Sequence, residues 1–581
     1  MLRRAIWASS LAAVITLAAA PLADVAWVEE QEVQPRSLLG SYLAGRLAKA
    51  ERDNDKAAQF YENVLTKDPD NELILERTFR LEAVSGNWAR AVRLADDVIT
   101  GEPSHQIARF ILAAEAFRKK NYKGAKAHFV AASKGALPEL TAKLSLAWTH
   151  LAEGKSDKAL AELAKMKKAD WSLFYQQYHK GLIADVAGKR KTARTALSRA
   201  FSSRPRTLRI AEAYARHAGH TGNFKLAKQV LKKHIGKSTG HPIAVTLLEK
   251  VNAGEKPSRL ISNPKHGLAE VFYAIGDALT GEDSTDVGLI YLRIALQLKP
   301  DFPLANLAIG ETYDRLDQFA PAIKAYDKVP KSSPIWKNVQ IRKAYALNST
   351  EDIEGAKALL TSLAEGTADD VRIYDALGSI LRSRQKYADA EKFYGKAIAL
   401  VKNPQKRHWS LYYARGVCHE QMKNWKDAEG DLEMALKLNP DQPLVLNYLG
   451  YSWVDQGTNL KRAMNLIRKA VKLKPDDGYF VDSLGWAHYR LGNFKKAVKY
   501  LERAVELRPE DPVINDHLGD AYWRVGRSLE AKYQWSQALT LEPEPDDERK
   551  IKEKLADGLK DGDETKAMAN TGKTTASESR N

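Results

Sequence analysis

The chain has 581 residues, of which 44% are hydrophobic and 28% charged, a composition typical of soluble globular proteins. This length exceeds what one hydrophobic core supports, so the chain holds several domains or an array of repeats that contact only their neighbours. Its single cysteine, Cys418, excludes an intramolecular disulfide framework and a cysteine-based metal cluster. Because Cys418 lies in a helical pattern beside Gly416, we expect a buried structural thiol.

The net charge of +17 is concentrated in one block of the chain. Residues 101–260 carry 31 basic and 11 acidic side chains, whereas residues 261–581 carry 47 of each. Such an asymmetry predicts an acidic partner or a polyanion for residues 101–260.

The N-terminus, residues 1–23, has the layout of a bacterial secretory signal. Arg3 and Arg4 precede an uncharged run that extends to Ala23. That run is just long enough to span a bilayer, so a cleaved signal peptide and an uncleaved N-terminal anchor both stay open. The basic residues before it predict that the rest of the chain is exported to the periplasm. Residues 24–37 follow as an acidic linker that contains proline.

A pattern of small residues and prolines then recurs along the chain. Six copies fill an N-terminal segment at 38–241, and eight more fill a C-terminal segment at 269–545. Between them, residues 242–268 predict one short helix and a hinge loop rich in glycine, proline, asparagine and serine. Residues 546–559 can form a charged capping helix, which a repeat array needs at its end. Residues 560–581 hold too few apolar residues to fold and predict a disordered tail.

The two copies at 478–511 and 512–545 are the clearest. Gly485 and Gly519 are 34 residues apart, and the same spacing separates Pro509 from Pro543. Small residues allow two antiparallel helices to approach closely, and the proline ends the second helix before the next pair begins.

This period resembles the tetratricopeptide repeat (TPR). The resemblance implies an all-α fold, a right-handed α-solenoid of about 14 antiparallel helix pairs in two segments. The motifs LNYLGYSWVDQG, DGYFVDSLGWAHYRLG and INDHLGDAYWRVG are similar to those of large exported TPR proteins of alphaproteobacteria. A weaker similarity extends to a TPR adaptor lipoprotein that assembles a periplasmic carboxyl-terminal processing protease. This chain lacks the lipobox cysteine, so the outer-membrane attachment of that relative does not carry over.

In the TPR family, the first helix of each pair lines a concave groove that binds peptides or partner helices. The resemblance implies that repeat positions 2, 5, 9 and 12 face this groove. In the last four repeats, the candidates are Tyr413, Asn447, Tyr451, Asp482, Trp486, Tyr489, Asp516, Asp520 and Trp523. Aromatic rings supply contact area, and Asn or Asp side chains can hold a peptide backbone. Alternatively, Trp486 and Trp523 belong to the core and the carboxylates are merely solvated.

The basic block carries a periodic pattern of its own. Cations recur one turn apart at positions 18 and 21 of three repeats: Lys123 and Lys126, Lys191 and Arg194, and Lys225 and Lys228. They form either a solvated face or a surface for anionic membrane headgroups, an envelope polyanion or an acidic partner. Nucleic acid is not expected, since no recognition motif is present.

Catalytic signatures are absent from the sequence. It contains no phosphate-binding GxxxxGK[ST], no GxSxG and no HExxH. His217 and His220 could share a helix face, but no third metal ligand is evident. We expect a non-enzymatic scaffold or adaptor of the bacterial cell envelope, without cofactor or metal. Its partner would be a peptide or protein, with an envelope protease or a cell-wall enzyme as candidates. The alternative is an envelope structural protein that docks on anionic lipid or polysaccharide through residues 101–260.

Overall fold

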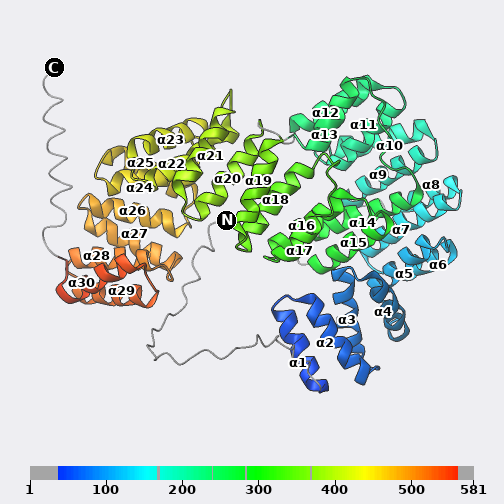
Figure 1. Cartoon of the computed structure of the whole chain (residues 1–581), viewed down its shortest axis with the longest axis horizontal. Coiled ribbons are helices and arrows are strands. Elements are labelled where there is room, and N and C mark those ends of the chain that lie inside the picture. Colours follow the sequence, from blue (N-terminus) through cyan, green and yellow to red (C-terminus); the bar gives the residue numbers. More distant parts are fainter. Residues whose placement is uncertain (1–36, 167–169, 238–239, 282–283, 367–368, 560–581) are drawn as a thin grey trace, which may run out of the picture. The chain divides into compact units, whose positions relative to one another are not determined.

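The computed structural model describes residues 37–166, 170–237, 240–281, 284–366 and 369–559, and every regular element in these ranges is a helix. Successive helices pack as pairs along the chain (Figure 1). The expected all-α solenoid of helix pairs is confirmed. The chain divides into two compact units between Leu359 and Leu360, inside α19 (Ile353–Glu365). The described part of unit 1 is residues 37–359, and that of unit 2 is residues 360–559.

The other helices of unit 1 fill its whole length. They are α1 (Leu38–Ala50), α2 (Asn54–Lys67), α3 (Glu72–Ser85), α4 (Trp88–Gly101), α5 (Gln106–Arg118), α6 (Tyr122–Ala131), α7 (Ala136–Ala152), α8 (Ser156–Ala164), α9 (Asp170–Val186), α10 (Arg190–Ser203), α11 (Leu208–His220), α12 (Phe224–Lys237), α13 (Pro242–Asn252), α14 (Pro264–Leu279), α15 (Thr285–Leu298), α16 (Pro303–Arg315), α17 (Phe319–Tyr326) and α18 (Trp336–Ser349).

Unit 2 continues with five helix pairs and one terminal helix. They are α20 (Val371–Ser383), α21 (Tyr387–Ala399), α22 (Trp409–Gln421), α23 (Trp425–Leu438), α24 (Pro443–Asp455), α25 (Leu460–Leu473), α26 (Gly478–Arg490), α27 (Phe494–Leu507), α28 (Pro512–Arg524), α29 (Ser528–Thr540) and α30 (Pro545–Asp557), with a short 3-10 turn, η1 (Lys406–His408), before α22.

Each helix pair closes over a small residue. In α26, Gly485 lies under Leu501 of α27, and a Cβ atom on this glycine would stand 2.6 Å from Leu501 Cγ. Ala497 and Ala504 of α27 are fully buried. The recurring small residues therefore mark the lines along which paired helices touch, which is why the 34-residue period locates the pairs.

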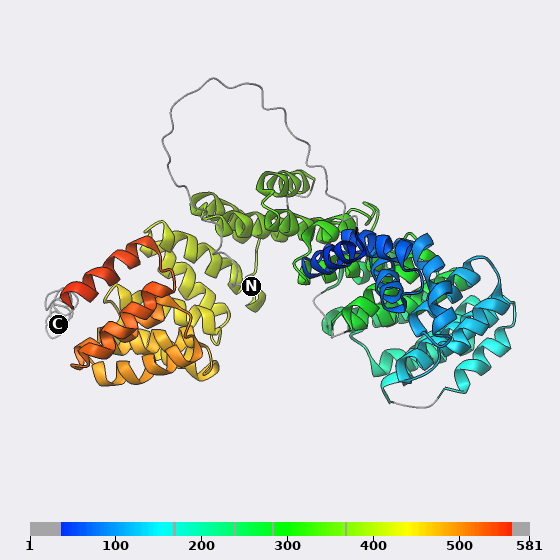
Figure 2. The same cartoon turned by 90° about the horizontal axis from the view of Figure 1, so that it is seen from below.

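Unit 1 folds back on itself. Helix α14 packs against α7 and α9, and α15 packs against α3 and α5, although up to about 200 residues separate these helices in sequence. Both views show the green α14 and α15 beside the blue and cyan helices (Figures 1 and 2). Gly267 of α14 lies against the buried indole of Trp148, where a Cβ atom would stand 2.2 Å from the ring. Only glycine permits this approach between α14 and α7.

The positions that would face a groove in unit 1 are thus buried under α14 and α15. Phe110 packs against Phe272 and Tyr291 with ring centroids 6.0 and 5.7 Å away. The Tyr178 hydroxyl donates to Glu270 at 2.8 Å. The chain's own helices occupy the inner face of this unit.

The sequence placed the junction between two segments at 242–268, and the structure divides elsewhere. Helix α13 packs against α11 and α12, Pro257 lies against Gly219, and α14 packs into the repeats before it. Residues 242–268 therefore lie inside unit 1, because the break in the repeat pattern is where the chain turns back over its own inner face.

Several predictions from the sequence fall outside the described residues. These are the signal peptide or anchor at 1–23, all but the last residue of the 24–37 linker, and the tail at 560–581. Across the part of the chain that the structure describes, no helix combines the length and apolar character needed to cross a membrane.

Candidate functional site

The first helices of the pairs in unit 2 place equivalent residues in one row. The fifth residues of α20, α22, α24, α26 and α28 are Asp375, Tyr413, Asn447, Asp482 and Asp516, and we call them the inner row. Three of them contact the sixth residue of the next first helix. Tyr413 meets Tyr448 with ring centroids 5.7 Å apart, Asn447 Nδ2 donates to Ser483 Oγ at 3.0 Å, and Asp482 Oδ1 lies 2.9 Å from His517 Nδ1.

The Asp482 contact belongs to a buried stack. Trp486 lies nearly parallel to His517, with ring centroids 4.0 Å apart, and to Tyr489, 4.7 Å away. Burial lowers the pKa of His517, but the Asp482 carboxylate outweighs this effect, so the net pKa is raised. Asp482, Tyr489 and His517 are buried and hold α26 against α28.

Helix α30 covers the end of the inner row. Lys554 Nζ donates to both carboxylate oxygens of Asp516 at 2.9 and 2.8 Å and to Asp520 at 2.8 Å. Trp535 Nε1 donates to the other Asp520 oxygen at 2.9 Å. Trp523 lies against Gly558, where a Cβ atom would stand 2.1 Å from the indole. These three candidates thus contact the terminal helix, and Lys554, which sequence reasoning missed, lies in the predicted capping helix.

Asp520 is the most perturbed carboxyl group of this contact. Burial and then the charge of Asp516 raise the pKa of Asp520 to about 6, and the ammonium group of Lys554 opposes this rise. The cation therefore holds together two carboxylates that would otherwise repel each other.

Tyr413, Asn447, Tyr451 and Trp486 stay half-buried on the same face. Asn447 Oδ1 and Trp486 Nε1 have no hydrogen-bond partner among the described residues. Burial raises the pKa of Tyr451, so its phenol stays protonated and can donate. Because Asn447 Oδ1 and Trp486 Nε1 are themselves buried, this stretch offers a partner mainly aromatic area and the Tyr451 hydroxyl. Its role in binding stays a prediction.

Asp375 was missed because sequence reasoning followed only the last four repeats. It occupies the same register in α20 as Asp482 does in α26. Burial raises the pKa of Asp375 to about 6, and the charge of Arg382 partly offsets this. The same repeat position, taken one repeat further toward the N-terminus and allowing for the four residues inserted before Trp409, would have found it.

The basic residues predicted from periodicity lie on α6, α10 and α12. Lys126 is ion-paired with Glu153 at 2.7 Å, and Lys123 is exposed. Lys191, Arg194 and Lys225 are exposed and Lys228 is half-buried, and none of these four has an ion pair within the described ranges. Helices α10 and α12 contain no Asp or Glu. We call these two helices the basic surface.

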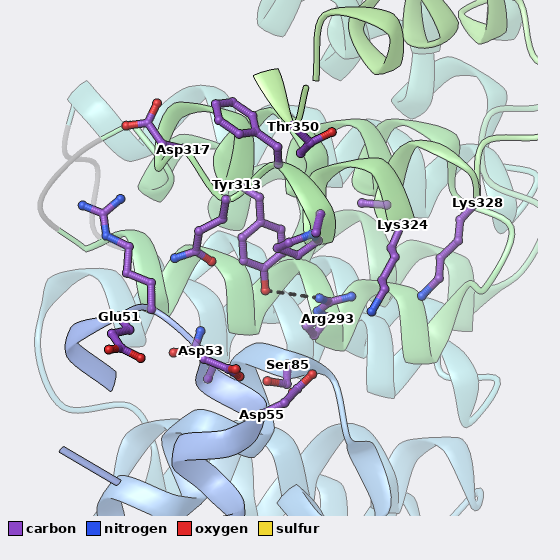
Figure 3. A pocket seen from close by; sticks show the side chains of 17 residues that line it. Glu51, Asp53, Asp55, Ser85, Arg293, Tyr313, Asp317, Lys324, Lys328 and Thr350 are labelled. Atoms are coloured by element: carbon purple, nitrogen blue, oxygen red, sulfur yellow. Dashed lines mark hydrogen bonds between the residues drawn. The ribbon is translucent and has the colours of Figure 1, made fainter. Parts of the chain in front are cut away.

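A cleft of about 640 Å³ opens in unit 1 where the turn between α1 and α2 approaches α16 and α17 (Figure 3). Arg293 Nε donates to the Val84 carbonyl at 3.0 Å, and its Nη2 lies 3.4 Å from the Tyr313 hydroxyl. Burial, together with the charge of Arg293, lowers the pKa of Lys328. The cleft marks the place where α3 meets α15 and α16.

The remaining polar candidates have structural partners. His217 Nδ1 lies 2.7 Å from Asp185 Oδ1, and His220 Nδ1 lies 3.2 Å from the Pro257 carbonyl oxygen, so the two histidines fix separate contacts. Cys418 is buried, as expected, and burial raises the pKa of its thiol to about 11. Such a thiol is a poor nucleophile.

Comparisons with known protein families match several parts of the chain. The tetratricopeptide repeat-like domain matches residues 47–210, and two tetratricopeptide repeat families match residues 373–407, 409–442 and 482–511. A TPR repeat-containing protein of Pseudomonas aeruginosa is 40% identical over 83 residues, which are 14% of each chain. A human protein O-mannosyl-transferase is 26% identical over 194 residues, which are 31% of this chain and 21% of the relative. The chain thus spans a seventh to about a fifth of the length of these relatives.

Solved structures of other repeat proteins are similar at low sequence identity. The APC/C heterotetramer Cut9–Hcn1 gives a TM-score of 0.37 at 14% identity, covering 90% of this chain and 96% of that one. MamA from Desulfovibrio magneticus gives a TM-score of 0.27 at 20% identity, covering 30% of this chain and 94% of that one.

The matched families fall in both units, and each matched segment coincides with helix pairs whose small residues recur every 34 positions. The chain is therefore a tetratricopeptide repeat protein.

Proposed function

We propose that this chain is a non-enzymatic scaffold that binds a protein partner on the inner face of unit 2. The observation that carries this proposal is the contrast between the two units. Helices α14 and α15 cover the inner face of unit 1, whereas in unit 2 each helix packs only on near neighbours along the chain. There, Tyr413, Asn447 and Tyr451 remain half-buried and supply surface for a partner.

The cell envelope is the proposed place of action. Its support is the signal-like stretch at 1–23, with Arg3 and Arg4 before an uncharged run. An envelope protease or a cell-wall enzyme is the proposed kind of partner.

The test compares the full chain with a triple variant, Tyr413→Ala, Asn447→Ala and Tyr451→Ala. These half-buried side chains are chosen in preference to Asp482 and Asp520, which are buried, and to Asp516, which is paired with Lys554, because substitution of those carboxylates would destabilise the unit. Each form is immobilised and exposed to a cell-envelope extract, and Tyr533→Ala on the outer helix α29 serves as control because Tyr533 is 68% exposed. We expect one protein to be retained by the wild type and the control and lost by the triple variant. Equal retention by all three forms would refute the proposal.

A second candidate function is docking on an anionic surface, and the basic surface favours it. Helices α10 and α12 present unpaired cations and no carboxylates, and each such cation near a membrane adds about 1 kcal/mol of attraction to anionic lipid. Lys191→Glu, Arg194→Glu, Lys225→Glu and Lys228→Glu together should lower binding to vesicles containing phosphatidylglycerol by more than about tenfold at low salt.

The matched control reverses four exposed lysines on second helices of unit 2: Lys472, Lys495, Lys496 and Lys499. It changes the net charge equally, so an equal loss of vesicle binding would show a general charge effect and would contradict a specific basic surface. Binding of the wild type to neutral phosphatidylcholine vesicles would contradict it as well.

A further inference from the structure

The inner row follows a rule of matched chemistry. Tyr413, Asn447 and Asp482 each meet a side chain of complementary chemistry from the next first helix, which supplies a ring, a hydroxyl and an imidazole in turn. Asp516, at the end of the row, instead meets the ammonium group of Lys554 from α30. The carboxylates of Asp482 and Asp516 are thus each met by a basic group, which comes from the next first helix for Asp482 and from the terminal helix α30 for Asp516.

Asp375 breaks this rule. The sixth residue of the next first helix, α22, is Ala414, whose methyl group cannot donate a hydrogen bond. No residue that the structure describes forms a hydrogen bond or ion pair with the Asp375 carboxylate. Arg382, whose charge partly offsets the effect of burial on Asp375, lies two turns along the same helix and donates to the Tyr394 hydroxyl at 3.3 Å.

The environment of Asp375 disfavours its ionised form. The residue is half-buried, and burial raises the pKa of its carboxyl group to about 6, so the group is mostly charged at neutral pH without a donor. A partly buried charge without a partner is destabilising. A cation brought to this position would remove that penalty.

We propose that Asp375 binds the cationic side chain of a lysine or arginine supplied by the partner protein, which completes the inner row as His517 and Lys554 complete it further along. The inference rests on the proposed scaffold function and deepens it by naming the chemistry of the partner. A charge-assisted hydrogen bond to Asp375 would supply most of the attraction. The ring of Tyr413, the next member of the row, offers an aromatic face to the same cation.

The first experiment uses two probes, an acetylated and amidated Ala-Ala-Arg-Ala-Ala peptide and the same peptide with uncharged citrulline in place of arginine. Binding to the full chain is measured by ligand-observed NMR at low salt. We expect the arginine peptide to bind and the citrulline peptide not to bind. Asp375→Asn should weaken the arginine peptide by about tenfold, as the loss of a hydrogen bond to a charged group does.

Two further variants sharpen the test. Asp389→Asn is the matched control, because Asp389 is exposed on the second helix of the same repeat and pairs with Lys392 at 3.1 Å. It should leave binding unchanged. Ala414→His places an imidazole at the position equivalent to that of His517 beside Asp482. This imidazole should pair with the Asp375 carboxylate and so abolish binding of the arginine peptide.

The inference is overturned if the wild type does not bind the arginine peptide, if citrulline binds equally well, or if Asp375→Asn binds like the wild type. The role of Asp375 is also refuted, while the scaffold function stands, if Asp375→Asn still captures the envelope partner that the Tyr413, Asn447 and Tyr451 triple variant loses. The scaffold function fails instead if that triple variant retains the partner.

Discussion

Asp375 is a residue whose ionisation should show in the pH dependence of stability. Its pKa in the folded chain is about 6, whereas an unfolded Asp ionises near pH 4. Between these values the folded state binds more protons, so stability falls as pH rises from about 4 to about 6. Asp375→Asn removes this loss, and we expect it to stabilise unit 2 by about 1 kcal/mol at pH 7.5, after allowance for solvent screening.

Urea denaturation of the wild type and Asp375→Asn at pH 4.5 and pH 7.5 checks this expectation. The advantage of the variant should be larger at pH 7.5. A difference that does not depend on pH would mean that the carboxyl group is solvated in the folded chain. A charged side chain that destabilises the folded state is typical of a residue that serves binding rather than stability.

The seating of α14 depends on one buried ion pair. Glu270 is fully buried and accepts from Arg209 Nε at 2.9 Å, while Arg209 Nη1 donates to Glu212 at 2.7 Å. Glu270→Gln keeps the shape but leaves the guanidinium group undercompensated, so unit 1 should lose about 3 kcal/mol of unfolding free energy. The measurement is urea denaturation followed by circular dichroism.

A double-mutant cycle separates this effect from packing. Glu270→Gln combined with Arg209→Met should lose less than the sum of the single losses, because the pair is removed together. Glu354→Gln is the control, since Glu354 is exposed and its loss should change stability by less than about 0.5 kcal/mol. If the losses of unfolding free energy in the cycle are additive, the ion pair does not hold α14 in place.

The terminal helix α30 depends on Lys554. Lys554→Ala removes the ammonium group that lowers the pKa of Asp520, and it leaves the Asp516 and Asp520 carboxyl groups without the cation that they share. We therefore expect the amides of α30 to exchange hydrogen faster than in the wild type at pH 7.5, with a smaller difference at pH 5. Lys552→Ala, on the exposed side of the same helix, should leave the exchange of α30 near that of the wild type. Equal effects of both variants would contradict this role of Lys554.

At the scale of the whole molecule, the two compact units predict two unfolding transitions. Each unit has its own buried core, and the division falls inside α19. In calorimetry, Glu270→Gln should lower one transition temperature and Asp375→Asn should raise the other. A single transition that moves with both variants would show that the units unfold as one.

The sequence predicted the helix pairs well because the contacts within each pair join residues that are close together in the sequence. Gly485 and Leu501, which touch, are 16 residues apart, so the 34-residue period contains the information. Glu270 and Tyr178 are 92 residues apart and follow no period, so the covering of the inner face of unit 1 could not be predicted. The candidate site was predicted as a row of side chains, but not the pairing of Asp516 with Lys554 across to α30.

The return of α14 and α15 into unit 1 also governs the order in which the chain can fold during synthesis. Phe110 and Trp148 emerge from the ribosome well before Phe272 and Gly267, which cover them. At a synthesis rate of roughly 5–20 residues per second, these apolar side chains remain without their covering contacts for on the order of ten seconds. Ordinary repeat arrays close each pair as it appears, whereas this unit has high contact order and should fold slowly. A fragment that ends at residue 241 would keep this surface bare and should aggregate, while one that extends to residue 359 should be soluble.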